Sequence, residues 1–101
     1  MSELISLQKK ENRYFLSGRL DRDTVPLFWQ TRAQWLCDDA SMVIDLSELD
    51  RIDSAGMAML LHLQQVIIDK KQNIVFINIP SQLKTLMQLS NIDDFLNQNA
   101  A

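Results

Sequence analysis

The sequence predicts a single α/β domain over residues 1–101, with a mixed β-sheet of about four strands and helices packed on it. Two apolar runs, Met42–Leu46 and Asn73–Ile79, are continuous enough to be strands buried on both faces. A segment with helical spacing of its apolar residues, Ser54–Ile68, lies between them. Strands that alternate with helices imply parallel crossover connections, so these segments indicate a sheet that is partly parallel.

The other elements follow from local signals, and the full order is strand, strand, helix, strand, helix, strand, helix. Leu4–Leu7 is a short apolar strand, and Arg13–Leu20 alternates two faces with the period of a strand. Glu11-Asn12 between them suits a hairpin turn. A helix is expected from Asp23-Thr24 to about Leu36, because Pro26 then falls in the first turn, where its missing N–H costs little.

The C-terminal part is expected to be helical after the strand Asn73–Ile79. Pro80 ends that strand, and Ser81 can cap a helix that continues to Leu89. A short closing helix or strand is expected around Asp94–Leu96.

Composition narrows the class of protein. Apolar residues make up 47% of the chain and charged residues 23%, as in a soluble globular domain. The net charge of −3 argues against nucleic-acid binding, which needs clustered Lys and Arg. Cys37 is the only cysteine, which excludes a disulfide framework and fits a reducing compartment. No signal peptide or membrane-spanning run is recognisable, so we expect a cytoplasmic protein that meets a membrane only through a partner.

The segment Asp53-Ser54-Ala55-Gly56 is the most informative one, because it places a hydroxyl and a carboxylate at the positive end of a helix. Ser54 is expected to be the N-cap, and its hydroxyl can also meet a partner or carry a phosphate. Asp53 either stabilises the helix start or acts as a general base for Ser54. No histidine lies close in sequence and no glycine-rich loop is present, so we expect no catalysis, no cofactor and no metal.

The helix after Asp53 has more apolar residues than one face needs. A first stripe, Gly56, Leu60, Leu63 and Ile67, is expected to face the sheet. A second stripe of three residues is rotated by about 100° from the first: Met57, Leu61 and Ile68. This second stripe either packs on a neighbouring helix or forms an exposed apolar patch beside Ser54. Trp29 raises the same question, since tryptophan is enriched among interface anchors.

The stretch VIDLSELDRIDSAGMAMLLHL, Val43–Leu63, resembles the signature of STAS domains, the sulphate transporter and anti-sigma factor antagonist family. Three flanking segments extend the resemblance over nearly the whole chain: Leu16–Gln30, Leu60–Leu63 and Ser81–Ile92. Within the family these segments are most similar to the small STAS subunit of an ABC transporter that moves phospholipids between the membranes of Gram-negative bacteria.

This resemblance implies a single STAS domain that is not an enzyme. It implies a cytoplasmic protein, peripheral to the inner membrane, that binds and supports the ATPase subunit of the transporter and, through it, the membrane permease. The implied process maintains the lipid asymmetry of the outer membrane. Six residues are expected to contact the partner: Asp53, Ser54, Ala55, Met57, Leu61 and Trp29.

Two other functions stay open at this point. In anti-sigma factor antagonists the position of Ser54 is phosphorylated by an anti-sigma factor kinase, so Ser54 is also a candidate phosphorylation site. Asp-Ser-Ala-Gly departs from the antagonists' common Asp-Ser-Ser-Gly, which favours the transporter branch. The other open function is a small hydrolase with Ser54 as its nucleophile, but the sequence supplies no base to activate this serine.

Overall fold

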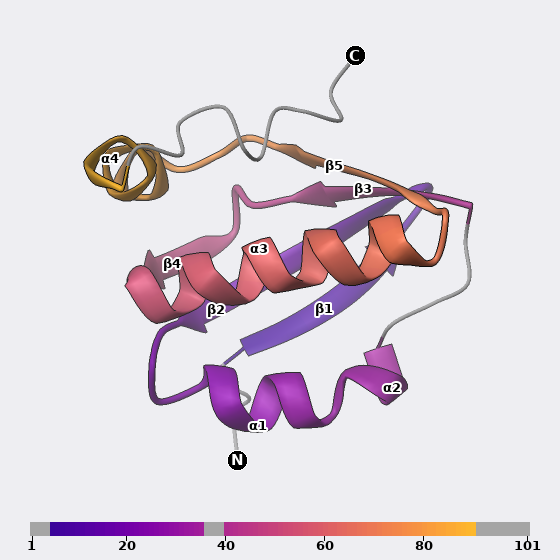
Figure 1. Cartoon of the computed structure of the whole chain (residues 1–101), viewed down its shortest axis with the longest axis horizontal. Helices are drawn as coiled ribbons and strands as arrows, with labels where there is room; N and C mark the ends of the chain where they lie inside the picture. Colours follow the sequence, from indigo (N-terminus) through magenta and orange to yellow (C-terminus); the bar gives the residue numbers. More distant parts are fainter. Residues whose placement is uncertain (1–4, 36–39, 91–101) are drawn as a thin grey trace.

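The computed structural model describes residues 5–35 and 40–90, which form one α/β domain with a mixed sheet (Figure 1). The elements follow one another as β1 (Ile5–Lys10), β2 (Arg13–Leu20), α1 (Val25–Gln30), α2 (Arg32–Trp35), β3 (Ser41–Asp45), β4 (Leu49–Ile52), α3 (Ser54–Asp69), β5 (Asn73–Ile77) and α4 (Ser81–Leu89). The predicted fold class and the order of its main elements are therefore confirmed.

The sheet has the strand order β1-β2-β3-β5, and β4 pairs with β2 beyond the end of β3. β1 and β2 form the expected antiparallel hairpin, with Glu11-Asn12 in its turn. The pairs β2–β3, β2–β4 and β3–β5 are parallel. Both predicted crossover connections are therefore present.

β4 is a fifth strand where the sequence indicated only an acidic linker. Its sequence, Leu-Asp-Arg-Ile, has two charges in four residues and carries no strand signal of its own. β3 pairs with β2 only at Tyr14 and Phe15, which leaves Gly18–Leu20 to pair with another strand. β4 forms because this open part of β2 accepts it.

The helices also differ in detail from expectation. The first is split into α1 and α2, which meet at Thr31, while Pro26 does lie in the first turn. α4 begins at Ser81, but its N-cap is Pro80 and no side-chain cap bond forms, so the expected Ser81 cap is wrong. Three expectations fall on residues outside the described ones: the strand start at Leu4, the helix end at Leu36, and the closing element at Asp94–Leu96.

The core lies between the sheet and the helices that cover one of its faces; α3 lies in front of β2 and runs roughly along β3, and α1 lies below α3 (Figure 1). Buried strand residues on this face alternate along β2, β3 and β5: Tyr14, Leu16, Met42, Ile44, Ile74 and Phe76. They pack in one cluster with Phe28 of α1, Leu60, Leu63 and Ile67 of α3, and Leu83 and Met87 of α4. The alternate strand residues point to the opposite face and lie outside this cluster.

Candidate functional site

Asp53 holds the start of α3 against the loop that precedes α1. Its Oδ1 accepts the Gly56 N–H at 3.0 Å, which makes Asp53 the N-cap of α3. Its Oδ2 accepts the N–H of Arg22 at 3.1 Å, across 31 positions of the chain. One carboxylate thus joins the two helix starts and fixes the position of the residue that follows it, Ser54.

The electrostatic surroundings favour the ionised form of this carboxylate. Partial burial acts to raise the pKa of Asp53, but the backbone N–H groups of Gly56, Arg22 and Ala55, together with Arg51, lower it below its usual value. The carboxylate is therefore charged at neutral pH, and its lone pairs are directed to the backbone.

The loop before α1 is itself fixed by Asp21 and Thr24, both of which are buried. The Asp21 carboxylate accepts the N–H groups of Asp23 at 3.0 Å and of Thr24 at 3.2 Å. The Thr24 hydroxyl donates to the Arg19 carbonyl at 2.8 Å. Sequence reasoning noticed Thr24 only as a helix start and missed Asp21, although Asp-x-x-Thr before a proline is a helix-start signal.

Ser54 is not the N-cap, so that expectation is wrong. It is the first residue of α3, and its side chain is exposed. Asp53 occupies the capping position because its longer-reaching carboxylate serves α3 and Arg22 at once. The Ser54 hydroxyl therefore does not cap α3, and Ser54 is exposed on the surface.

Gly56 explains why α3 can start so close to the sheet. A Cβ built at this position would collide with the carbonyl oxygen of Leu20 and lie 2.9 Å from Ile52 Cγ1. Only glycine lets the first turn of α3 rest on the ends of β2 and β4. This contact fixes the position of the first turn of α3, which contains Ser54 and Ala55, relative to the sheet.

The second apolar stripe of α3 is not one exposed patch. Met57 is buried, with 7% of its side chain exposed, while Leu61 is partly buried and Ile68 is 41% exposed. Met57 belongs to the buried core cluster, and α3 packs against both α1 and α4. The expectation of an exposed patch is therefore wrong for Met57, while its contact with a partner stays a prediction.

The exposed ridge of α3 follows a different set of residues, which we name the α3 crest. Along the helix it consists of Ser54, Ala58, Leu61, His62 and Gln65. Leu61 is the single apolar member of any size and is half-buried; the others are exposed. Ser54 and Leu61 are seven residues apart, which places them on one line along the helix.

Trp29 borders the α3 crest from α1. Its ring lies 6.3 Å from the His62 ring and 6.5 Å from the Trp35 ring, and the guanidinium of Arg32 lies 4.7 Å from it. It is therefore partly buried in an aromatic cluster yet retains an exposed part. On α1 the sequence missed Leu27, which is 68% exposed on the flank away from Trp29.

Neither His62 nor Asp53 is placed to act as a catalytic base for Ser54. His62 is eight residues further along α3, about 12 Å along the helix axis at 1.5 Å per residue. Asp53 directs both carboxylate oxygens to backbone N–H groups. Among residues 5–35 and 40–90 no three His, Cys, Asp or Glu side chains gather as a metal site. None of the described helices has the length and apolarity needed to cross a bilayer.

Comparisons with known proteins agree with this architecture. Residues 5–97 match the family model described as Mlab, STAS domain. The chain is 32% identical over 92 residues to the intermembrane phospholipid transport system binding protein MlaB of Escherichia coli K12, covering 91% of this chain and 93% of that one. It is 32% identical over 96 residues to the MlaB protein of Haemophilus influenzae, covering 89% and 91% respectively.

A solved structure shows the same fold. The unphosphorylated form of the anti-sigma factor antagonist SpoIIAA superposes with a TM-score of 0.60 at 15% identity, covering 88% of this chain and 82% of that one. This likeness concerns the fold alone. The family match over residues 5–97 and the two relatives together show that the chain belongs to the STAS domain family, in its MlaB branch.

Proposed function

We propose that this protein is the STAS subunit of an intermembrane phospholipid transport system and that it binds and supports the ATPase subunit of the transporter. In this role it is not an enzyme, and it lies at the inner membrane only through its partners. Two relatives that are 32% identical over about 90% of the chain have names from such a system. The observation that carries the interface is the exposed Ser54 at the rigidly capped start of α3.

The α3 crest suits a protein contact. Ser54 and Ala58 are small, so a partner can approach the helix closely there. Leu61 and Trp29 offer partly exposed apolar surface on either side, and tryptophan is a common anchor at interfaces. Because Asp53 and Gly56 fix the first turn of α3, little conformational entropy would be lost on docking. Asp53 and Ala55 belong to the proposed interface as supports of Ser54.

Replacement of Ser54 by arginine tests this interface. The side chain is exposed, so Ser54→Arg should fold normally, but docking would bury an unpaired charge and be lost. Ser81→Arg is the matched control, because Ser81 is also an exposed first residue of a helix, on α4. Each variant is co-expressed with the ATPase subunit of the transporter, and the purified complex is quantified. Normal recovery of the ATPase with Ser54→Arg would contradict the proposed interface.

An anti-sigma factor antagonist is the second candidate, because the exposed Ser54 hydroxyl is accessible to a kinase. A phosphate there would add about −1.5 to −2 charges beside the Asp53 carboxylate, which already binds the nearest N–H groups. The antagonists' common Asp-Ser-Ser-Gly has the same aspartate, so this repulsion does not separate the two functions, and the names of the two relatives favour the transporter. Intact-mass measurement of the protein from its native cells decides between the two, since a stoichiometric phosphate on Ser54 would support the antagonist.

A further inference from the structure

Trp29 is the largest side chain of the proposed interface, and three groups surround its ring. The Trp35 ring of α2 lies 6.5 Å from it at an angle of 58°, and the His62 ring of α3 lies 6.3 Å from it at 53°. Tilted rings at such distances attract each other edge to face. The Arg32 guanidinium lies 4.7 Å from the centre of the ring. The Trp29 ring is therefore held from α2 and α3, although part of it is exposed.

Arg32 contacts Trp29 twice. Its Nη1 donates to the Trp29 carbonyl at 2.9 Å, and its guanidinium lies within cation–π distance of the Trp29 ring. A planar guanidinium can donate a hydrogen bond at its edge while its face lies against an aromatic ring, which the compact ammonium of a lysine cannot do. This double contact fixes the Trp29 ring relative to the backbone of the same residue.

The end of α1 is also held by two side chains other than Arg32. The Thr31 hydroxyl lies 3.1 Å from the Phe28 carbonyl, within hydrogen-bond distance. The Trp35 indole N–H donates to the same carbonyl at 2.9 Å, and the Trp35 ring stacks on the Phe28 ring at 4.5 Å. Because these contacts already fix the last turn of α1, the feature that depends most directly on Arg32 is the orientation of Trp29.

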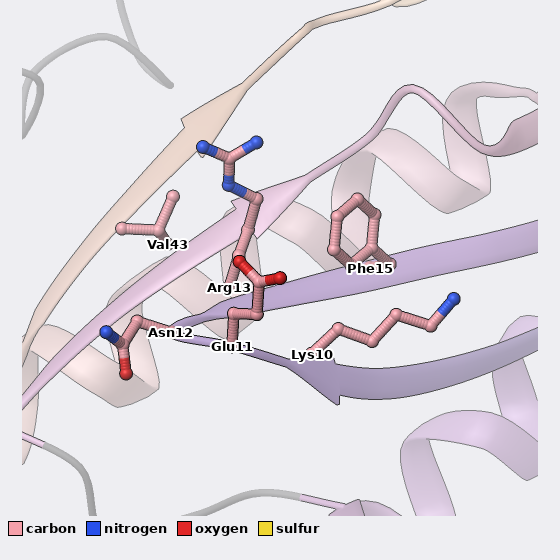
Figure 2. A pocket seen from close by; sticks show the side chains of 6 residues that line it. All are labelled: Lys10, Glu11, Asn12, Arg13, Phe15 and Val43. Carbon is pink, nitrogen blue, oxygen red and sulfur yellow. The ribbon is translucent and has the colours of Figure 1, made fainter.

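The contacts of Arg32 differ from those of the arginines on β2. Arg13, which lines a hollow beside the β1–β2 turn (Figure 2), lies 3.5 Å from the buried Asp45. Arg19 lies 3.9 Å from the buried Asp21. These two cations compensate buried carboxylates, which are costly for the fold when unpaired. Arg32 is instead exposed and faces an aromatic ring at the protein surface.

We propose that Arg32 is a positioning residue that holds the Trp29 ring in the orientation in which it contacts the ATPase subunit. This inference rests on the proposed function, because it concerns the same contact surface. A side chain that is ordered before docking loses less conformational entropy when the complex forms. Arg32 acts through the Trp29 ring and not by a contact of its own with the partner.

The first measurement uses the full chain, free in solution and labelled with ¹⁵N. Its two tryptophans give two indole N–H signals, and that of Trp35 is an internal reference because it is bonded to a backbone carbonyl. In Arg32→Ala we expect the order parameter of the Trp29 indole to fall below about 0.6, the range of flexible groups, while that of Trp35 stays unchanged. The matched control is Gln34→Ala, an exposed position of the same helix, which should change neither.

The second measurement is the affinity for the purified ATPase subunit of the transporter, in a double-mutant cycle. Arg32→Ala should weaken binding about three- to tenfold, because docking must then order a mobile ring. Gln34→Ala should change the affinity less than about twofold. In a Trp29→Leu background, Arg32→Ala should also change it less than about twofold, because the ring that Arg32 positions is absent.

Thermal unfolding checks the fold of each variant, and the Tm of Arg32→Ala should stay within about 5 °C of the wild type. Three outcomes would overturn the proposal: an unchanged order parameter of the Trp29 indole, an unchanged affinity of Arg32→Ala, or a loss of affinity that persists in full in the Trp29→Leu background. The first two do not depend on the folding of Trp29→Leu. In all three the wild type binds the ATPase subunit, whereas a wild type that does not bind would refute the proposed function and this role with it.

Discussion

Removing the carboxylate of Asp53 should destabilise the domain far more than its partial exposure suggests. Asp53→Ala deletes the N-cap bond to Gly56, which contributes about 1 kcal/mol. It also deletes the acceptor for the Arg22 N–H, which contributes about 1 kcal/mol more. The expected loss in the free energy of unfolding is therefore about 2 kcal/mol. For a domain of this size that corresponds to a fall in Tm of about 10 °C.

Asp53→Asn separates the contributions. Asparagine caps helices as well as aspartate does, but its single side-chain oxygen cannot serve Gly56 and Arg22 as two carboxylate oxygens do. Its expected loss is about 1 kcal/mol. Urea titration followed by tryptophan fluorescence measures both losses, with Asp50→Ala, an exposed position on β4, as the control.

The sign of the pH dependence is fixed by the lowered pKa. Because the pKa of Asp53 is lower in the folded protein than its usual 3.8, its charge stabilises the fold fully above that value. This contribution is lost as the pH falls through the folded-state pKa, so the gap between the wild type and Asp53→Ala should narrow at low pH. A gap below about 0.5 kcal/mol at pH 7 would refute the proposed role of Asp53 as a bridge between two helix starts.

Two further predictions concern the packing and the polar network of the domain. Gly56→Ala should lower the free energy of unfolding by about 1–3 kcal/mol in urea titration, because the new Cβ collides with the Leu20 backbone. The control is Ala58→Gly at an exposed position of the same helix, which should lower the free energy of unfolding by about 1 kcal/mol through helix propensity alone. A Gly56→Ala variant that is more stable than the wild type would contradict the close contact. Burial acts to raise the pKa of Asp45, but hydrogen bonds from Ser47 and Asn78 and the charge of Arg13 lower it overall. The ionised Asp45 therefore stabilises the fold above its usual pKa of 3.8, and this contribution is lost as the pH falls below that value. Asp45→Asn should therefore lose less stability than the wild type between pH 5 and pH 2 in thermal unfolding monitored by circular dichroism, and parallel losses would refute this role.

Much of the fold follows from local patterns. The apolar runs around Ile44 and Phe76 predicted two strands, and the period of the residues after Asp53 predicted a helix facing the sheet. The expectation that both strands are buried on both faces is wrong, because Val43, Val75 and Ile77 on the second face are only half-buried. β4 did not follow, because Leu49–Ile52 is extended only through its pairing with β2. A strand that depends on a partner leaves no periodicity in its own sequence.

The geometry of the candidate site was predicted in part. The sequence placed Ser54 at the start of a helix and Asp53 beside it, and both positions are confirmed. It assigned the cap to the wrong residue, because the carboxylate also serves Arg22, a partner 31 positions away. It could not assign the second stripe, since the burial of Met57 depends on the packing of the core around α3.

By itself the sequence determined most of the strands and helices, where α3 begins, and the family to which the motif around Ser54 belongs, because each of these depends on neighbouring residues. The tertiary structure alone decided which side of α3 is exposed, which residue caps it and which sheet face the described helices leave open. Those features depend on contacts between segments that are distant in sequence, and no local pattern encodes such contacts.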